Sequence, residues 1–516
     1  MKKIIVLFIF SACSLFGQET FPTNGITNQN KSNYAFTNAI LIVNPETTIE
    51  KATLLISNGK IIDVGKSITP PDGFVVVDLA GNYIYPSFID IYTQYGIEEA
   101  KRKKENNPGP QMFSSKSGAF GWNEAVKPEV NGADLFSIDN KEIEEWLKAG
   151  FGAVLTHQLD GIVRGTATFT LLGKESENKS ILKREAASLY SFSKGVSRQD
   201  YPSSLMGSIA LLKQTYHDAY WYKNGGNKLE ENISLDEFNS IQDLPQIFEV
   251  RDVLSIPRAD KIGDEFGKQY IIKGSGNEYQ KIDLVKSAEV RLIIPINFPD
   301  AFDVEDPFDA ELVSLEAMKH WELAPLNPMM LDKAGIEFAI TSLGTKSKNE
   351  FWTNLRKSIN LGFNKKTALK ALTTIPAKLI NSEEMAGTLD KGKIANFLIT
   401  SGDIFDESTQ IYQNWVAGKP TVLASFEDKS LAGNFELTFN GFNYDLEIES
   451  KDSKLKSKVT FENEKAIPAK INYGNELVTL SFSDSARGYF RLNGIFDSQN
   501  RTFKGKGQDE NGKWFS

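Results

Sequence analysis

Cysteine and histidine are almost absent from this sequence. Its 516 residues include one cysteine, Cys13, and three histidines, His157, His217 and His320. Disulfide frameworks and zinc sites built from thiolates need several cysteines, so the chain can form neither by itself. Three histidines also leave few nitrogen ligands for a catalytic metal.

Basic residues are also fewer than acidic ones. The chain has 58 Lys and Arg against 67 Asp and Glu, which gives a net charge of −9. A phosphate backbone requires a basic surface, so we expect no nucleic-acid partner. Hydrophobic residues make up 41% of the chain and charged residues 24%, as in folded proteins rather than disordered ones. Its length is enough for two to four domains.

An apolar run at the N-terminus is too short to span a bilayer. Two lysines precede this run, residues 4–10, and small residues follow it up to Gly17. This is the pattern of a secretory signal peptide, and we expect cleavage after Gly17 and a periplasmic or secreted protein. The alternative is a lipoprotein anchored at Cys13, which is less favoured because Phe10 stands where a lipobox usually has leucine.

The pattern of apolar residues changes twice along the chain. Residues 36–78 and 396–420 contain β-like runs, and the dipeptide Asn58-Gly59 predicts a hairpin in the first of them. Between these regions, strands such as 153–155, 292–296 and 338–341 alternate with helical stretches such as 141–149 and 205–222. Alternation over about 300 residues predicts an α/β barrel.

Beyond Ser430 the alternating runs predict a separate antiparallel β module. Its last strand carries Trp514 and Phe515 and would leave an unpaired edge, which proteins normally cover or pair. We therefore expect either a C-terminal continuation of the same chain or a partner that covers this edge.

Three segments, in the same order, resemble the amidohydrolase superfamily and particularly its imidazolonepropionase-like branch. They are ISNGKIIDVG at 56–65, YIYPSFIDIYTQ at 83–94 and AGTLDKGKIANFL at 386–398. The resemblance implies a (β/α)8 barrel and a composite β-sandwich formed by the segments that flank it. The expected domains are a signal peptide at 1–17, the composite β-sandwich at 18–80 and 386–428, the barrel at 81–385, and an antiparallel β module, complete or truncated, at 429–516.

The catalytic pattern of that family is altered in this chain. Family members read Asp-x-His-x-His at the end of the first barrel strand, where the histidines bind a divalent metal such as zinc that activates water. Here Asp90 remains, but Tyr92 and Gln94 stand at the histidine positions, and Leu343 replaces the last-strand aspartate. The histidines of the middle strands have no obvious match. We therefore expect no metal and no other cofactor.

Other polar residues are candidates for a pocket at the barrel mouth. His157 follows a predicted strand, although a hydrogen-bonded strand-end residue would look the same. Arg164 could hold a carboxylate through two hydrogen bonds or form a surface ion pair. Glu278 and Asn297 fall at predicted strand ends. The full candidate set, which includes no metal ligand, is Asp90, Tyr92, Gln94, His157, Arg164, Glu278, Asn297 and Leu343.

Three functional hypotheses follow. By resemblance the chain would hydrolyse non-peptide C–N bonds, but the replacements at Tyr92, Gln94 and Leu343 favour a non-catalytic half, a pseudoenzyme. Such a half would act beside a catalytically intact homologue or a C-terminal continuation of the same chain. The alternatives are a metal-independent hydrolase with His157, Asp90 or Glu278 as base, and a module that binds a small-molecule ligand.

Overall fold

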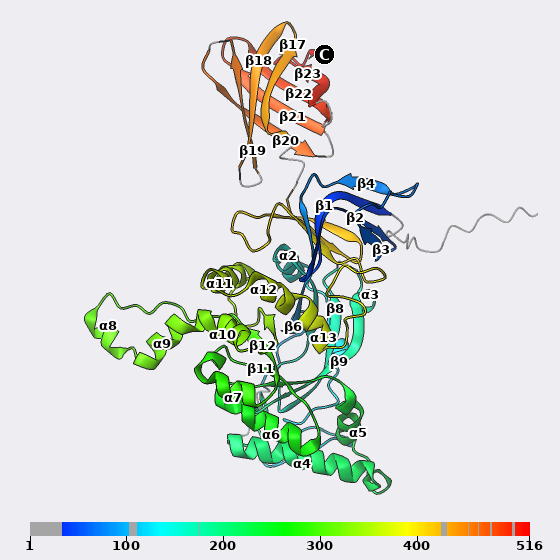
Figure 1. Ribbon diagram of the computed structural model, residues 1–516, viewed down its shortest axis with the longest axis vertical. Coiled ribbons are helices and arrows are strands. Elements are labelled where there is room, and N and C mark those ends of the chain that lie inside the picture. Colours follow the sequence, from blue (N-terminus) through cyan, green and yellow to red (C-terminus); the bar gives the residue numbers. More distant parts are fainter. Residues whose placement is uncertain are drawn as a thin grey trace, which may run out of the picture.

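The structure, a computed structural model, contains three β-sheets of eight strands each (Figure 1). It describes residues 33–102, 111–173, 175–424, 431–451, 454–462, 464–474, 477–497 and 501–515. The predicted signal peptide, with Cys13, lies outside the described residues. Within these ranges, none of the helices has the length and apolarity that crossing a membrane requires.

The first sheet joins two segments that are far apart in the sequence. Its order is β16-β15-β14-β5-β1-β2-β3, with β4 paired to β1. Asn58 and Gly59 form the turn between β2 and β3 with φ angles of 50° and 76°, as the predicted hairpin requires. β5 lies in this sheet although the expected barrel range begins at residue 81. The strands are β1 (Tyr34–Asn44), β2 (Thr47–Ser57), β3 (Lys60–Gly65), β4 (Val75–Asp78), β5 (Tyr83–Pro86), β14 (Phe397–Thr400), β15 (Ile411–Val416) and β16 (Lys419–Val422).

The second sheet forms the barrel. Its strands follow the sequence order β6 (Phe88–Thr93), β7 (Phe151–Thr156), β8 (Val163–Leu171), β9 (Ile181–Ser191), β10 (Gln246–Glu249), β11 (Ile271–Lys273), β12 (Arg291–Pro295) and β13 (Phe338–Thr341). The Thr341 hydroxyl donates to the carbonyl of Tyr92, which links the last strand to the first. The predicted α/β barrel is thus confirmed. It differs from a uniform parallel barrel in one respect, because β8 runs antiparallel to both of its neighbours.

Helices pack around this barrel. The helices predicted at 141–149 and 205–222 are confirmed as α2 and α4. The Asp139 side chain caps α2, which buries Ile143, Trp146 and Leu147 at helical spacing. The helices are α1 (Gly132–Leu135), α2 (Asn140–Lys148), α3 (Glu177–Ser180), α4 (Leu205–Lys223), α5 (Ile233–Ser240), α6 (Ile256–Phe266), α7 (Ile282–Ser287), α8 (Pro307–Leu312), α9 (Leu315–Leu323), α10 (Asn327–Lys333), α11 (Lys348–Asn360), α12 (Lys365–Leu372) and α13 (Thr374–Leu379). Short 3-10 helices are η2 (Gly226–Lys228), η3 (Ile241–Asp243), η4 (Val253–Ser255), η5 (Glu278–Lys281) and η6 (Ala324–Leu326).

The third sheet is the predicted antiparallel β module. Each strand pairs with the next along the chain, and the inner face carries an aromatic core in which Phe515 stacks on Phe439 at 5.2 Å. Trp514 is exposed. The strands are β17 (Gly433–Phe439), β18 (Phe442–Lys451), β19 (Lys454–Phe461), β20 (Ile467–Gly474), β21 (Leu477–Asp484), β22 (Gly488–Asp497), β23 (Thr502–Gln508) and β24 (Trp514–Phe515).

Candidate functional site

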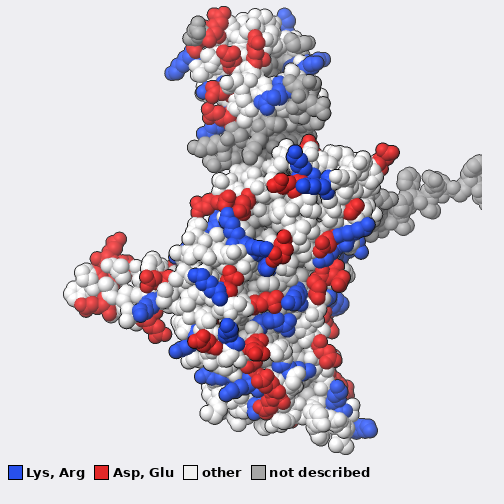
Figure 2. Space-filling view, in the orientation of Figure 1, with Lys and Arg blue, Asp and Glu red and all other residues white. Residues whose placement is uncertain are grey.

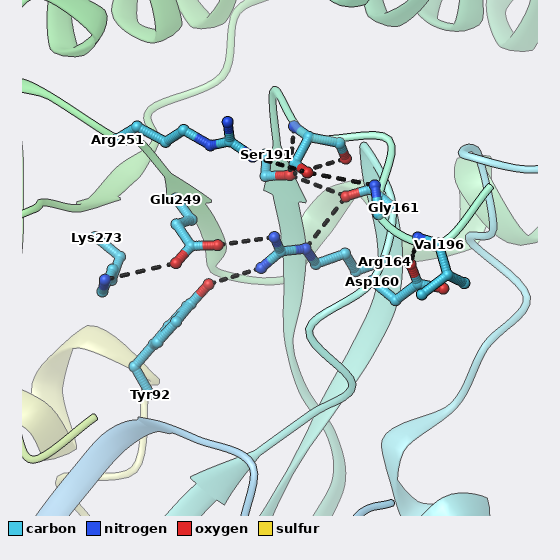
Figure 3. A network of polar contacts seen from close by, with 11 residues as sticks. Tyr92, Asp160, Gly161, Arg164, Ser191, Val196, Glu249, Arg251 and Lys273 are labelled. Atoms are coloured by element: carbon cyan, nitrogen blue, oxygen red, sulfur yellow. Dashed lines mark hydrogen bonds and ion pairs between the residues drawn. The ribbon is translucent and has the colours of Figure 1, made fainter. Parts of the chain in front are cut away.

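A polar network lies where several barrel strands end (Figure 3). The guanidinium of Arg164 donates to the Tyr92 hydroxyl at 2.8 Å and to Oε2 of Glu249 at 2.7 Å. The other carboxylate oxygen of Glu249 lies 3.5 Å from Nζ of Lys273. Arg164 reaches this end of the barrel because β8 is reversed, so that the beginning of β8 adjoins the carboxyl ends of the other strands. We call Tyr92, Arg164, Glu249 and Lys273 the polar network.

Burial and neighbouring charges set the ionisation of the network. Burial favours the neutral form of Glu249, but the charges of Arg164 and Lys273 outweigh it and lower the pKa of Glu249 to about 2. Burial also disfavours the charge on Arg164, yet Tyr92 and Glu249 raise its pKa further. The pKa of Tyr92 is raised chiefly by burial, so its hydroxyl stays neutral. The network therefore joins the Glu249 carboxylate to two basic side chains, Arg164 and Lys273.

His157 lies against the network without joining it by a hydrogen bond. Its ring meets the Tyr92 ring edge-on, with the centroids 4.6 Å apart. The side chain is fully buried, and neither ring nitrogen has a hydrogen-bond partner. Burial, reinforced by the charge of Arg164, lowers the pKa of His157 to about 3. The imidazole is therefore neutral and too weak a base to take a proton from water near neutral pH.

Asp90 belongs to a second cluster, between β6 and β13. One of its carboxylate oxygens accepts from the Tyr92 amide, and the other accepts from the amide and the hydroxyl of Ser342 at 2.7 and 2.9 Å. Lys348 donates to the same hydroxyl at 2.8 Å, and its ammonium lies over the Trp146 ring. Burial raises the pKa of Asp90 and lowers that of Lys348 to about 8.

Two cavities open at this end of the barrel. One has a volume of about 310 Å³, and its lining includes Gln94, Leu343 and Lys348. The other has a volume of about 490 Å³, and Glu249 and Arg251 reach its wall. Hydroxyl groups dominate the rest of the second lining, from Ser191, Ser193, Ser203, Ser204, Ser208 and Ser255.

The remaining candidates lie apart from the network. Glu278 is buried, and its carboxylate accepts from the backbone amides of Ser275 and Gly276 and from the Asn327 side chain, so it holds the loop after β11 together. Asn297 is exposed after β12. The structure thus groups Tyr92, His157 and Arg164, and places the other candidates around them or elsewhere.

Sequence reasoning missed two members of the network. Glu249 is the last residue of β10 and Lys273 the last residue of β11. A charged residue that ends a short apolar strand was the available signal in both cases.

The residues present do not fit a divalent metal. The basic side chains of Arg164 and Lys273 would repel a cation, and the Tyr92 hydroxyl already accepts from Arg164. Within the described part of the chain, no group of three or more His, Cys, Asp and Glu side chains could hold a metal ion.

Comparison with solved structures identifies the architecture. An amidohydrolase from Thermotoga maritima MSB8 superimposes with a TM-score of 0.61 at 21% identity, over 75% of this chain and 99% of that one. The chain has the amidohydrolase fold. Molinate hydrolase and the dihydropyrimidinase of Brevibacillus agri NCHU1002 match at a TM-score of 0.43, with 11% and 12% identity, each over 76% of this chain and 95% of its own. No family model matches the chain, and no curated protein matches its sequence.

Proposed function

We propose that this amidohydrolase-fold chain is a pseudoenzyme, a barrel that has lost metal-dependent hydrolysis of C–N bonds. The observation that carries the proposal is the pair of basic side chains, Arg164 and Lys273, held around Glu249 at the barrel mouth. A structural neighbour of the chain is an amidohydrolase, and this activity is the one that the sequence resemblance implies.

The chemistry of the network supports this proposal. Metal-dependent hydrolysis needs a water whose pKa is lowered toward neutrality and a group that accepts its proton. Glu249 and His157, with pKa values of about 2 and 3, are too weakly basic for that task at neutral pH. Both oxygens of Asp90 already accept hydrogen bonds, one from the Tyr92 amide on the same strand and the other from Ser342, next to β13. The network is therefore suited to stabilising the barrel rather than activating water.

Metal content and hydrolysis together test the proposal. The purified full chain, prepared without chelators, should contain far less than one equivalent of zinc, manganese or iron by elemental analysis. It should hydrolyse neither cyclic amides nor dipeptides, with or without added metal. One equivalent of metal that survives dialysis, or turnover that a chelator abolishes, would contradict it. As a pseudoenzyme the chain would act beside a catalytically intact partner or a continuation of the same polypeptide.

One observation favours a second function, acyl transfer without a metal. Ser342 lies within hydrogen-bond distance of both Lys348 and Asp90, beside the cavity that Gln94 lines. With a pKa of about 8, Lys348 is partly neutral in mildly alkaline solution and could accept the hydroxyl proton, as in serine–lysine dyads. A fluorophosphonate probe should then label the wild type and not the Ser342→Ala variant, with Ser347→Ala as the control. Absence of labelling would dismiss this function and leave the pseudoenzyme.

A further inference from the structure

An arm formed by α8 and α9 projects from the barrel (Figure 1). It comprises residues 300–323 and follows β12, so it rises from the same end of the barrel as the polar network. Neither helix buries a single residue. Several contacts fix its base, among them a hydrogen bond of 3.0 Å between the Tyr279 hydroxyl and Nδ1 of His320 and an ion pair between Lys346 and Asp300.

The arm exposes large apolar side chains. Phe308, Leu312 and Leu315 are 78%, 84% and 65% exposed. Phe308 and Leu312 are four residues apart on α8 and therefore share one face of it, and Leu315 begins the next helix. We call these three side chains the apolar ridge. An apolar surface on a projecting element is a mark of a protein or membrane contact, since a free monomer gains nothing by exposing it.

The arm also concentrates the negative charge of the chain. Eight acidic residues and one lysine give it a net charge of −7, out of −9 for the whole chain. Figure 2 shows acidic side chains on the projecting part. The acidic residues are Asp300, Asp303, Glu305, Asp306, Asp309, Glu311, Glu316 and Glu322.

This charge decides which kind of surface the ridge fits. Anionic lipid surfaces and nucleic acids would repel the arm. A second copy of the chain is a poor fit, because its own arm is acidic and the rest of the chain carries −2 and offers no matching excess of positive charge. A separate protein with lysines and arginines around an apolar groove satisfies both the ridge and the charge.

We propose that the arm docks the apolar ridge into a basic-rimmed groove on a separate protein. The inference rests on the proposed function in one respect, since it names the surface through which a pseudoenzyme would hold its partner. Because the arm is anchored at the barrel mouth, the partner lies at that end of the barrel.

Site-specific photocrosslinking tests the proposal. The crosslinking residue benzoylphenylalanine is placed at position 308 of the full chain in the producing organism, and at the exposed Leu229, remote in sequence from the arm, as a control. We expect position 308 to crosslink to one protein, and the mass of this adduct should differ from that of two crosslinked copies of the chain. Position 229 should not give this adduct. An adduct of two copies, a lipid adduct or no adduct would overturn the proposal.

A titration with the purified, crosslinked partner completes the test. The double substitution F308D/L312D should weaken binding by about tenfold or more, because the ridge would be the buried centre of the contact. Leu229→Asp should leave binding unchanged, and added salt should weaken it. Equal binding by F308D/L312D would refute the docking of the ridge. Stoichiometric bound metal would instead refute the pseudoenzyme proposal without changing the crosslinking result. Failure of the proposed function and failure of the docking proposal are therefore distinguishable.

Discussion

Mild acid should destabilise the barrel through His157. In the folded protein its pKa is about 3, whereas an unfolded histidine titrates near its ordinary value of 6.5. Below pH 6.5 the unfolded chain therefore binds a proton that the folded chain does not. Stability is complete above pH 6.5 and falls as the pH drops toward 3.

The size of this effect follows from the two pKa values. At pH 5.0 the unfolded histidine is protonated and the folded one is not, which costs about 2 kcal/mol of folding free energy. The loss grows to about 5 kcal/mol near pH 3. Because the side chain is fully buried, exposure to solvent does not reduce it.

His157→Phe isolates the contribution. Phenylalanine keeps the edge-on contact with Tyr92, and neither ring nitrogen has a hydrogen bond to lose. We expect the variant to be within about 1 kcal/mol of the wild type at pH 7.5. At pH 5.0 its stability relative to the wild type should be about 2 kcal/mol higher than at pH 7.5.

Chemical denaturation at the two pH values measures this difference, and comparison with the wild type cancels the titration of all other groups. His217→Gln, on the exposed face of α4, is the control and should follow the wild type. If His157→Phe and the wild type lose the same stability between pH 7.5 and 5.0, the folded histidine is protonated in that range and the reasoning fails.

Three further outcomes are expected. Arg164→Met should lower the free energy of unfolding by about 3–5 kcal/mol in equilibrium denaturation, because it leaves Glu249 without one of its two basic partners. Adding Glu249→Gln should restore part of the lost stability. A loss below about 1 kcal/mol would count against a stabilising role of the network. The double variant Tyr92→His/Gln94→His should still contain no zinc by elemental analysis, because Arg164 and Lys273 remain. Tightly bound stoichiometric zinc would contradict the view that these two basic residues prevent metal binding. Asp90→Asn should lower stability by about 2 kcal/mol in the same denaturation assay, because an amide nitrogen would face backbone and hydroxyl donors. An unchanged denaturation midpoint would show that Asp90 does not contribute to the closure of the barrel.

Local sequence signals predicted much of the fold. Asn58-Gly59 adopts the positive φ angles that its hairpin needs, and the helical periods at 141–149 and 205–222 match α2 and α4. The direction of β8 was not predictable from its own residues. All nine are buried, and a strand buried on both faces has no alternation that distinguishes parallel from antiparallel pairing.

The candidate site also has one feature that the sequence predicts and another that only the tertiary structure decides. The prediction that Tyr92, Gln94 and Leu343 replace metal-site residues of the family comes from the sequence alone, because it depends on residue identity at the positions that the resemblance matches. The polar network is not visible there, since Arg164 contacts Glu249, which is 85 positions away in the sequence, and Tyr92, which is 72 positions away. From the sequence a surface ion pair is the favoured interpretation of Arg164. Closure of the barrel and reversal of β8 bury it, and a buried guanidinium must find an anion and hydrogen-bond acceptors there because water no longer solvates it.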